Sequence, residues 1–233
     1  MKSLGKALDI LEYAVLQNGE RVTPTHAANA LGINLATCTR IMRELVKRDY
    51  LVQVSRKDGY VPGPMIPSLA TRHNSYEQLA SAARIPIEKL SEKLGCQVNF
   101  SVLHADRRIM LCYHLSRREQ RPWDHFIFSD HWETATGRLL IATLNEREAR
   151  KLVSAAGVRT FPRKELELIR QSRSILFRQG ELAVMGRLIL LPGYPAAAFG
   201  FGVPQGLAGK ASAAAEKTAV EIEESLNQPN HAY

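Results

Sequence analysis

Apolar residues recur every three or four positions at the start of the chain, which is the spacing of a helix with one buried face. The pattern predicts a first helix that stops before Gly19 and a second helix over 24–31, capped by Thr23. A third helix begins after a further capping residue, Asn34, and runs to about Arg48. The predicted apolar face of the first helix consists of Leu4, Ala7, Leu8, Leu11, Ala14 and Val15.

The third predicted helix has two unlike faces. At 100° per residue, Cys38, Ile41, Met42 and Leu45 share one side. Small and hydroxyl-bearing residues begin the other side, and long cations follow them. A helix that enters the major groove of DNA needs short residues at its N-terminal end and cations that reach bases or phosphates. An ordinary amphipathic surface helix remains an alternative on this pattern alone.

A short basic hairpin follows the third helix directly. YLVQV and YVPG have the composition of strands, and the turn SRKDG between them places Gly59 at its tight position. A basic wing beside a cationic helix favours a winged helix-turn-helix and a polyanionic partner. The predicted DNA contacts are Thr23, Thr25, Asn34, Leu35, Ala36, Thr37, Thr39, Arg40, Arg43, Lys47, Arg56 and Lys57.

Beyond this hairpin the chain changes character. A polar stretch over 64–84 predicts a connecting helix, with a break at Ile85-Pro86 because proline disrupts helices. Residues 85–233 mix strands and helices, so we predict a winged-helix domain over 1–63 and a second domain over 85–233, with an α+β or α/β fold class overall. The predicted strands of the second domain are 97–104, 108–115, 125–128, 181–191 and 196–203, and its predicted helices are 85–95, 135–144, 146–157, 164–180 and 208–226.

Charge and composition strengthen the nucleic-acid interpretation. The chain carries a net charge of +8, and residues 40–57 hold six basic and two acidic side chains, half of that surplus. No apolar run is long enough for a signal peptide or a membrane span, which predicts a cytoplasmic protein. The three cysteines, Cys38, Cys96 and Cys112, are too widely spaced for a zinc motif and are expected to be buried free thiols.

Residues 104–133 hold the most reactive side chains. The segment WDHFIFSDHWE contains Asp124, His125, Asp130, His131 and Glu133, and His104 and His114 flank Cys112. These residue types serve metal sites and Cys-His catalysis, so an enzyme or a redox or metal sensor is the alternative function. Their spacing matches no established metal motif, and we expect no metal, no cofactor and no catalytic residue.

Several segments together resemble the IclR-type (isocitrate lyase regulator) family of bacterial transcription factors, over nearly the whole chain. The resemblance comes from SLGKALDILE in the first helix, the Gly-Tyr pair of the wing, and the entry SEKLGCQVNFSVL into a GAF-like domain. It is most specific at ETATGRL and extends to AAAFGFGVP, which is similar to the last core strand of the family.

The resemblance implies a homodimer or homotetramer on a palindromic operator, repressing or activating transcription. It also implies that the GAF-like domain binds a small organic acid or aromatic effector where Thr134-Ala135-Thr136-Gly137 starts a helix. Glycines stand where the family has ligand-binding serines, and a leucine replaces its cysteine. This favours a larger, less polar effector for which the glycines make room, or a cavity that no longer senses a ligand. The implied ligand-site residues are Thr134, Ala135, Gly137, Arg138, Leu188, Gly200 and Gly202.

Overall fold

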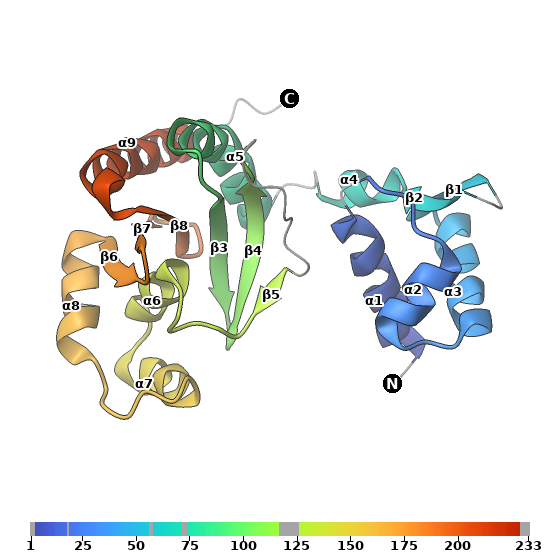
Figure 1. Ribbon diagram of the computed structural model, residues 1–233, viewed down its shortest axis with the longest axis horizontal. Helices are drawn as coiled ribbons and strands as arrows, with labels where there is room; N and C mark the ends of the chain where they lie inside the picture. Colours follow the sequence, from blue (N-terminus) through green and yellow to red (C-terminus); the bar gives the residue numbers. More distant parts are fainter. Residues whose placement is uncertain (1–2, 18, 56–57, 71–73, 117–125, 229–233) are drawn as a thin grey trace. The chain divides into compact units, whose positions relative to one another are not determined.

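The helices and the hairpin predicted for the first 63 residues are present in the computed structural model (Figure 1). The structure describes residues 3–17, 19–55, 58–70, 74–116 and 126–228, and contacts divide the chain into two units that we treat separately. The described elements of the first unit are α1 (Ser3–Leu16), α2 (Pro24–Leu31), α3 (Leu35–Lys47), β1 (Leu51–Ser55), β2 (Gly59–Pro62) and α4 (Met65–Ala70).

The two predicted capping residues of this unit start their helices. Thr23 accepts a hydrogen bond from the backbone N–H of His26 at 3.2 Å, through its side-chain oxygen. The Asn34 side-chain oxygen accepts from the N–H groups of Ala36 and Thr37, at 3.0 and 3.4 Å. Each cap satisfies donors that the first turn of a helix leaves unpaired, so the helix boundaries follow from local chemistry.

The predicted apolar face of α1 is partly wrong. The core of the first unit takes Ile10 and Ala14 from α1, and packs them on residues that include Cys38 and Met42 of α3. Leu4 and Leu8 are instead 71% and 50% exposed. The spacing of leucines alone could not reveal which side of α1 faces α3, because apolar residues lie on more than one side of this helix.

The wing is attached to the chain that precedes α2. Val22 and Tyr60 exchange two backbone hydrogen bonds, of 2.8 and 2.9 Å, and extend the antiparallel β1–β2 pair. Gly59 has a φ of +86°, and a Cβ at this position would lie 2.5 Å from the carbonyl oxygen of Val22. Glycine is therefore required both for the turn and for the approach of Val22.

The second unit contains a six-stranded sheet in the order β5-β4-β3-β8-β7-β6, within the described part of the chain. Every neighbouring pair of these strands is antiparallel, so the unit is of the α+β kind. Its described elements are α5 (Ser75–Leu94), β3 (Val98–His104), β4 (Arg107–His114), β5 (Ile127–Phe128), α6 (Ala135–Ala142), α7 (Glu146–Ala155), α8 (Arg163–Ser172), β6 (Ser174–Gln179), β7 (Leu182–Ile189), β8 (Ala197–Pro204), a 3-10 turn (Gln205–Leu207) and α9 (Ala208–Asn227).

Two helical layers cover this sheet (Figure 1). On one face, α5 and α9 pack on each other and on strand residues such as Phe100, Phe199 and Phe201. On the other face, α6 packs on β3, β7 and β8, and α8 packs on α6. Strand residues alternate between the two cores, as the pleat of a sheet covered on both faces requires.

The predicted helix break at Ile85-Pro86 is wrong. In place of one connecting helix over 64–84 and a further short helix, the structure has α4 in the first unit and an uninterrupted α5 in the second. Pro86 costs α5 one backbone hydrogen bond, but it is buried with Ala83 and Ile87 against the sheet and α9. The burial of this face of α5 stabilises the continuous helix more than the hydrogen bond lost at Pro86 destabilises it.

The predicted helix over 164–180 is wrong in its second half. The helix α8 ends where Arg173 adopts a left-handed conformation, with a φ of +52°. The residues that follow pair as strand β6 with β7, from Ser174 opposite Arg187 to Gln179 opposite Leu182. A short run such as SILF fits either a helix or a strand, and only pairing with β7 decides.

The three cysteines are free thiols, as predicted. Cys38 and Cys96 are buried, and Cys112 is half-buried. Cys38 lies in the core of the first unit, and Cys96 lies in the core that α5 and α9 share with the sheet. Burial raises the pKa of the Cys112 thiol to about 12, and it also raises the pKa of Cys38. A thiol with such a pKa stays protonated at neutral pH and reacts slowly.

None of the described helices combines the length and the apolar character that crossing a membrane requires.

Changing Gly137 to alanine should destabilise the second unit. The new Cβ would lie 1.9 Å from the backbone oxygen of His131, so α6 or the loop before it must shift. We expect a loss of about 3 kcal/mol in the free energy of unfolding, measured by urea titration with circular dichroism. Gly209→Ala is the control, because nothing lies within 4 Å of its added Cβ, and it should not lower stability. Equal stability of the two variants would contradict this packing.

The Cys112 thiol should resist labelling in the folded protein at pH 8. With a pKa of about 12 rather than 9.0, its thiolate fraction is roughly a thousandfold smaller than that of a free cysteine. The measurement is the labelling rate of the Cys112 peptide with a disulfide reagent, followed by mass spectrometry. The guanidinium-unfolded protein serves as control, and equal rates in both states would show that Cys112 is not protected.

Candidate functional site

Helix α3 presents its cationic face to solvent. Arg40, Arg43 and Lys47 are exposed, as is Ala36 near the start of the helix. Thr37 and Thr39 are half-buried at the margins of this face. The face is accessible on the first unit and is shaped for a groove, because its N-terminal turn is slim and its cations lie behind it.

Some of the predicted contact residues already serve the helix itself. The Asn34 side chain caps α3, and the Thr39 hydroxyl donates to the carbonyl oxygen of Leu35 at 2.9 Å. Leu35 is exposed, although its carbonyl is engaged in this way. Thr23 is likewise engaged as the cap of α2, whereas Thr25 is exposed in the first turn of that helix.

An acidic residue interrupts the cationic face. Lys47 donates a hydrogen bond of 2.7 Å to a carboxylate oxygen of Glu44, which lowers the pKa of the Glu44 carboxyl below its usual range. Both side chains are exposed, so the pair is weak and Lys47 can exchange Glu44 for a phosphate. The predicted contacts Arg56 and Lys57 lie outside the described residues. Beside them, Asp58 bonds to Ser55 and pairs with Arg21 at 3.4 Å.

A small cavity of about 110 Å³ lies at the start of α6. Of the ligand-site residues implied by the family resemblance, Thr134, Ala135 and Gly200 line it. The remaining lining residues are Asn99, Glu133, Thr136, Gln179, Val184 and Phe201. The cavity therefore forms where α6 begins above strands β3, β7 and β8.

Two polar atoms in the wall of this cavity are buried without a hydrogen-bond partner among the described residues, namely Thr136 Oγ1 and Asn99 Oδ1. Thr136 is only 1% exposed. The Asn99 Nδ2 group donates to the carbonyl oxygen of Gly200 at 3.2 Å, which fixes the orientation of the amide and leaves its oxygen free. Both atoms are therefore available to hydrogen-bond a molecule held in this cavity.

The backbone at the start of α6 adds hydrogen-bond donors. The Thr134 side chain caps the helix by accepting from the N–H of Gly137 at 3.1 Å. The N–H groups of Ala135 and Thr136 belong to the first turn, which has no intrahelical acceptors for them. This end of a helix favours negative charge, as the resemblance implied.

Four of the implied ligand residues do not line the cavity. Gly137 lies against the backbone of His131, and Leu188 is buried in the core between α6 and the sheet. The Arg138 guanidinium pairs with Glu165 at 3.0 Å and stacks over aromatic rings, so it serves to hold α6. A Cβ on Gly202 would meet Leu182 and Val184 on the neighbouring strand.

The expectation that the glycines make room for a larger ligand stays a prediction, but the space beside Gly200 is limited. A Cβ on Gly200 would meet the side chains of Thr136 and Ala135 at 3.1 and 3.2 Å. The space left by the absent side chain is thus occupied by α6 itself, and the cavity stays small.

A buried arginine holds the loop before α6. Arg108 on β4 is 1% exposed and bonds to Asp130 at 2.6 Å and to Ser101 at 3.4 Å, with its guanidinium 4.3 Å from the Phe128 ring centroid. His131 interacts through Nε2 with the carbonyl oxygen of Asp106 at 2.8 Å. Sequence reasoning treated Asp130 and His131 as potential metal ligands, whereas here they bind the β3–β4 hairpin.

The other reactive residues do not come together. His104 pairs with Arg107 at one end of the β3–β4 hairpin, and His114 pairs with Val98 at the other end. No group of three or more potential metal ligands occurs among the described residues, and Asp124 and His125 lie outside them. His114 instead contacts Glu92 of α5 at 3.2 Å.

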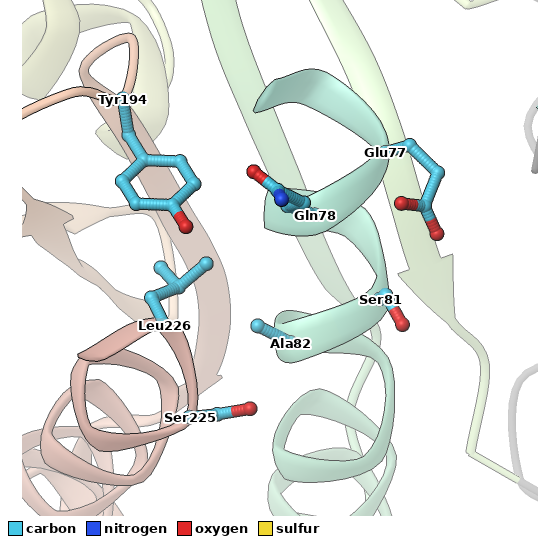
Figure 2. A pocket seen from close by; sticks show the side chains of 7 residues that line it. All are labelled: Glu77, Gln78, Ser81, Ala82, Tyr194, Ser225 and Leu226. Atoms are coloured by element: carbon cyan, nitrogen blue, oxygen red, sulfur yellow. The ribbon is translucent and has the colours of Figure 1, made fainter. Parts of the chain in front are cut away.

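A second cavity, of about 190 Å³, lies between α5 and the end of α9. Figure 2 shows Tyr194 and Leu226 on one side of it and Gln78 and Ala82 on the other, whereas Glu77 points away. None of its seven lining side chains is a buried polar group without a partner. The first cavity is therefore the better candidate for a ligand site.

Comparisons with known proteins bear on the fold. No protein-family model matches the chain, and no curated protein matches its sequence. Solved structures do match over nearly their whole length. One is an IclR homologue from Microbacterium hydrocarbonoxydans in complex with 4-hydroxybenzoate, with a TM-score of 0.73, 16% identity, and coverage of 98% of this chain and 100% of that chain.

Two further solved structures agree with this one. The IclR protein of Thermotoga maritima has a TM-score of 0.64 at 18% identity, with coverage of 96% of this chain and 98% of that chain. An IclR transcriptional regulator from Alicyclobacillus acidocaldarius has a TM-score of 0.66 at 16% identity, with coverage of 97% and 98%. The chain thus has, in both of its units, the fold of IclR-type transcriptional regulators.

Proposed function

We propose that this protein is an IclR-type transcriptional regulator whose affinity for operator DNA is changed by a small organic ligand in the second unit. The observation that carries the proposal is the exposed face of α3, with Arg40, Arg43 and Lys47 behind a slim first turn. The concentration of positive charge over residues 40–57 and the fold of the chain support it.

In this proposal the domains divide the work. The first unit, with residues 1–72, binds DNA through α3 and the wing, and the second unit, which begins at residue 73 with α5 in it, senses the effector. The ligand acts by favouring one arrangement of the DNA-binding domains over another, so that its binding energy shifts an existing equilibrium. Catalysis has no role in this proposed mechanism.

We further propose that the protein is at least a homodimer on a palindromic operator. Support comes from a groove of about 430 Å³ on the first unit, between α1 and α3, whose lining is mostly apolar and also includes Arg40, Glu44 and Arg48. Leu4 and Leu8 line it and are exposed, although neither is needed for the core of this unit. A second copy that covers these leucines would place two α3 helices on one duplex, as an inverted repeat requires.

Selection of bound fragments from random duplex DNA should enrich an inverted repeat. The expected result is two half-sites about 10–10.5 base pairs apart, or a multiple of this, since each α3 occupies one major groove. Enrichment of a single half-site would contradict the dimer, and the absence of any enriched sequence would contradict the proposed function.

Changing Arg43 to alanine should weaken specific binding by about 1–3 kcal/mol and relax the preference at one base position. The measurement is affinity for the selected operator and for its single-base variants at fixed salt. Arg147→Ala removes an equally exposed arginine from α7 and should leave affinity unchanged. If the Arg43 variant instead binds all of these sequences more weakly by the same factor, Arg43 contacts a phosphate and not a base.

Changing Leu8 to glutamate should weaken self-association by at least about tenfold, because burying an unpaired carboxylate in the α1 surface is costly. Sedimentation velocity over a range of protein concentrations measures this. Leu168→Glu, on an exposed position of α8, is the matched control. If only the control lowers the oligomeric state, the contact lies on the second unit.

A further inference from the structure

The cavity at the start of α6 offers two kinds of hydrogen-bonding groups. The first turn of α6 supplies donors, the N–H groups of Ala135 and Thr136, with the buried Thr136 hydroxyl beside them. The second kind is an acceptor, Asn99 Oδ1, which is buried and has no described partner. A ligand that satisfies both must carry an acceptor group and a donor group.

The relative position of these groups follows from the sheet. Asn99 on β3 pairs with Gly200 on β8, so both face the same side of the sheet. The first turn of α6 lies directly over Gly200, because a Cβ there would be 3.4 Å from the backbone nitrogen of Thr136. The donors and the acceptor are therefore separated by little more than the width of one strand, a spacing that suits a compact ligand.

The charge of the cavity wall indicates which kind of hydrogen-bond donor the ligand carries. Glu133 precedes the cap of α6 and is one of the lining residues of the cavity, whereas no lysine or arginine lines it among the described residues. A plain carboxylate bound to the start of α6 would meet this negative charge without compensation. A ligand with an additional ammonium group would place a positive charge near Glu133 and a hydrogen-bond donor beside Asn99 Oδ1.

Size limits the ligand further. The cavity, of about 110 Å³, is small beside the roughly 300–1,000 Å³ that is usual for the sites of drug-sized ligands, which favours a small ligand. We propose that this cavity binds a small α-amino acid as a zwitterion, with its carboxylate at the start of α6 and its ammonium group toward Asn99 and Glu133. This inference rests on the effector role proposed for the same cavity.

The test compares ligands that differ in one group. Isothermal titration of the full-length protein with L-alanine, L-lactate and propionate should give the order alanine, lactate, propionate, with at least about tenfold between the first and the last. L-phenylalanine should bind more weakly than L-alanine because it exceeds the cavity. Equal or tighter binding of propionate would overturn the amino-acid assignment, and tighter binding of L-phenylalanine would overturn the size limit.

A variant of Glu133 tests whether this residue causes the preference for an amino acid over a hydroxy acid. Glu133→Gln should reduce the advantage of alanine over lactate by about tenfold and leave propionate unaffected or bound more tightly. Glu133 is exposed, so the variant should fold normally, and Glu167→Gln on the exposed side of α8 is the control. An unchanged preference in the Glu133 variant would contradict the placement of the ammonium group.

The same ligands separate this inference from the proposed function. If propionate binds best and changes affinity for the selected DNA, the regulator function stands and the amino-acid inference falls. If none of these ligands binds, the inference also falls, and the DNA selection still tests the function on its own. If alanine binds as expected but no duplex is enriched, the ligand class stands and the proposed function falls.

Discussion

The close approach of α6 to its surroundings is the constraint on which the second unit depends, and three glycines permit it. At Gly137 a side chain would collide with the backbone of His131, and at Gly200 it would press on the first turn of α6. At Gly186 it would meet Leu139 and the backbone of Phe199. Because these side chains are absent, α6 packs closely against the strands beneath it. The same contact that packs the core therefore places helix N–H groups beside Asn99 and keeps the cavity small.

Local chemistry made much of the fold predictable from the sequence. Caps at Thr23 and Asn34 act within a few residues, and each starts a helix where it was expected. The failures arise where distant parts of the chain decide. Pro86 signals a break, yet burial against the sheet and α9 keeps α5 continuous, and Leu176 belongs to a strand only because β7 is available for pairing. No local pattern contains that information.

The candidate site was predictable to a similar extent. Thr134 and Ala135, which the resemblance at ETATGRL implies as ligand-site residues, do line the cavity, because a helix start is a local feature. Asn99 was missed, since its role depends on its register with Gly200, about a hundred residues later in the chain. A polar residue between the buried Val98 and Phe100 was the available signal, because asparagine is uncommon in such strands.

Strand β3 connects the cavity to α5, the helix that follows the first unit in sequence. Asn99 faces the cavity on one side of the strand, and Val98, Phe100 and Val102 face the core that α5 shares on the other side. A ligand can act at a distance only through an element whose contacts differ between two states. Because β3 has the proposed ligand site on one face and α5 on the other, a shift that brings Asn99 to a ligand would also move the residues of β3 on which α5 packs. The unpaired oxygen of Asn99 gives such a shift a source of free energy.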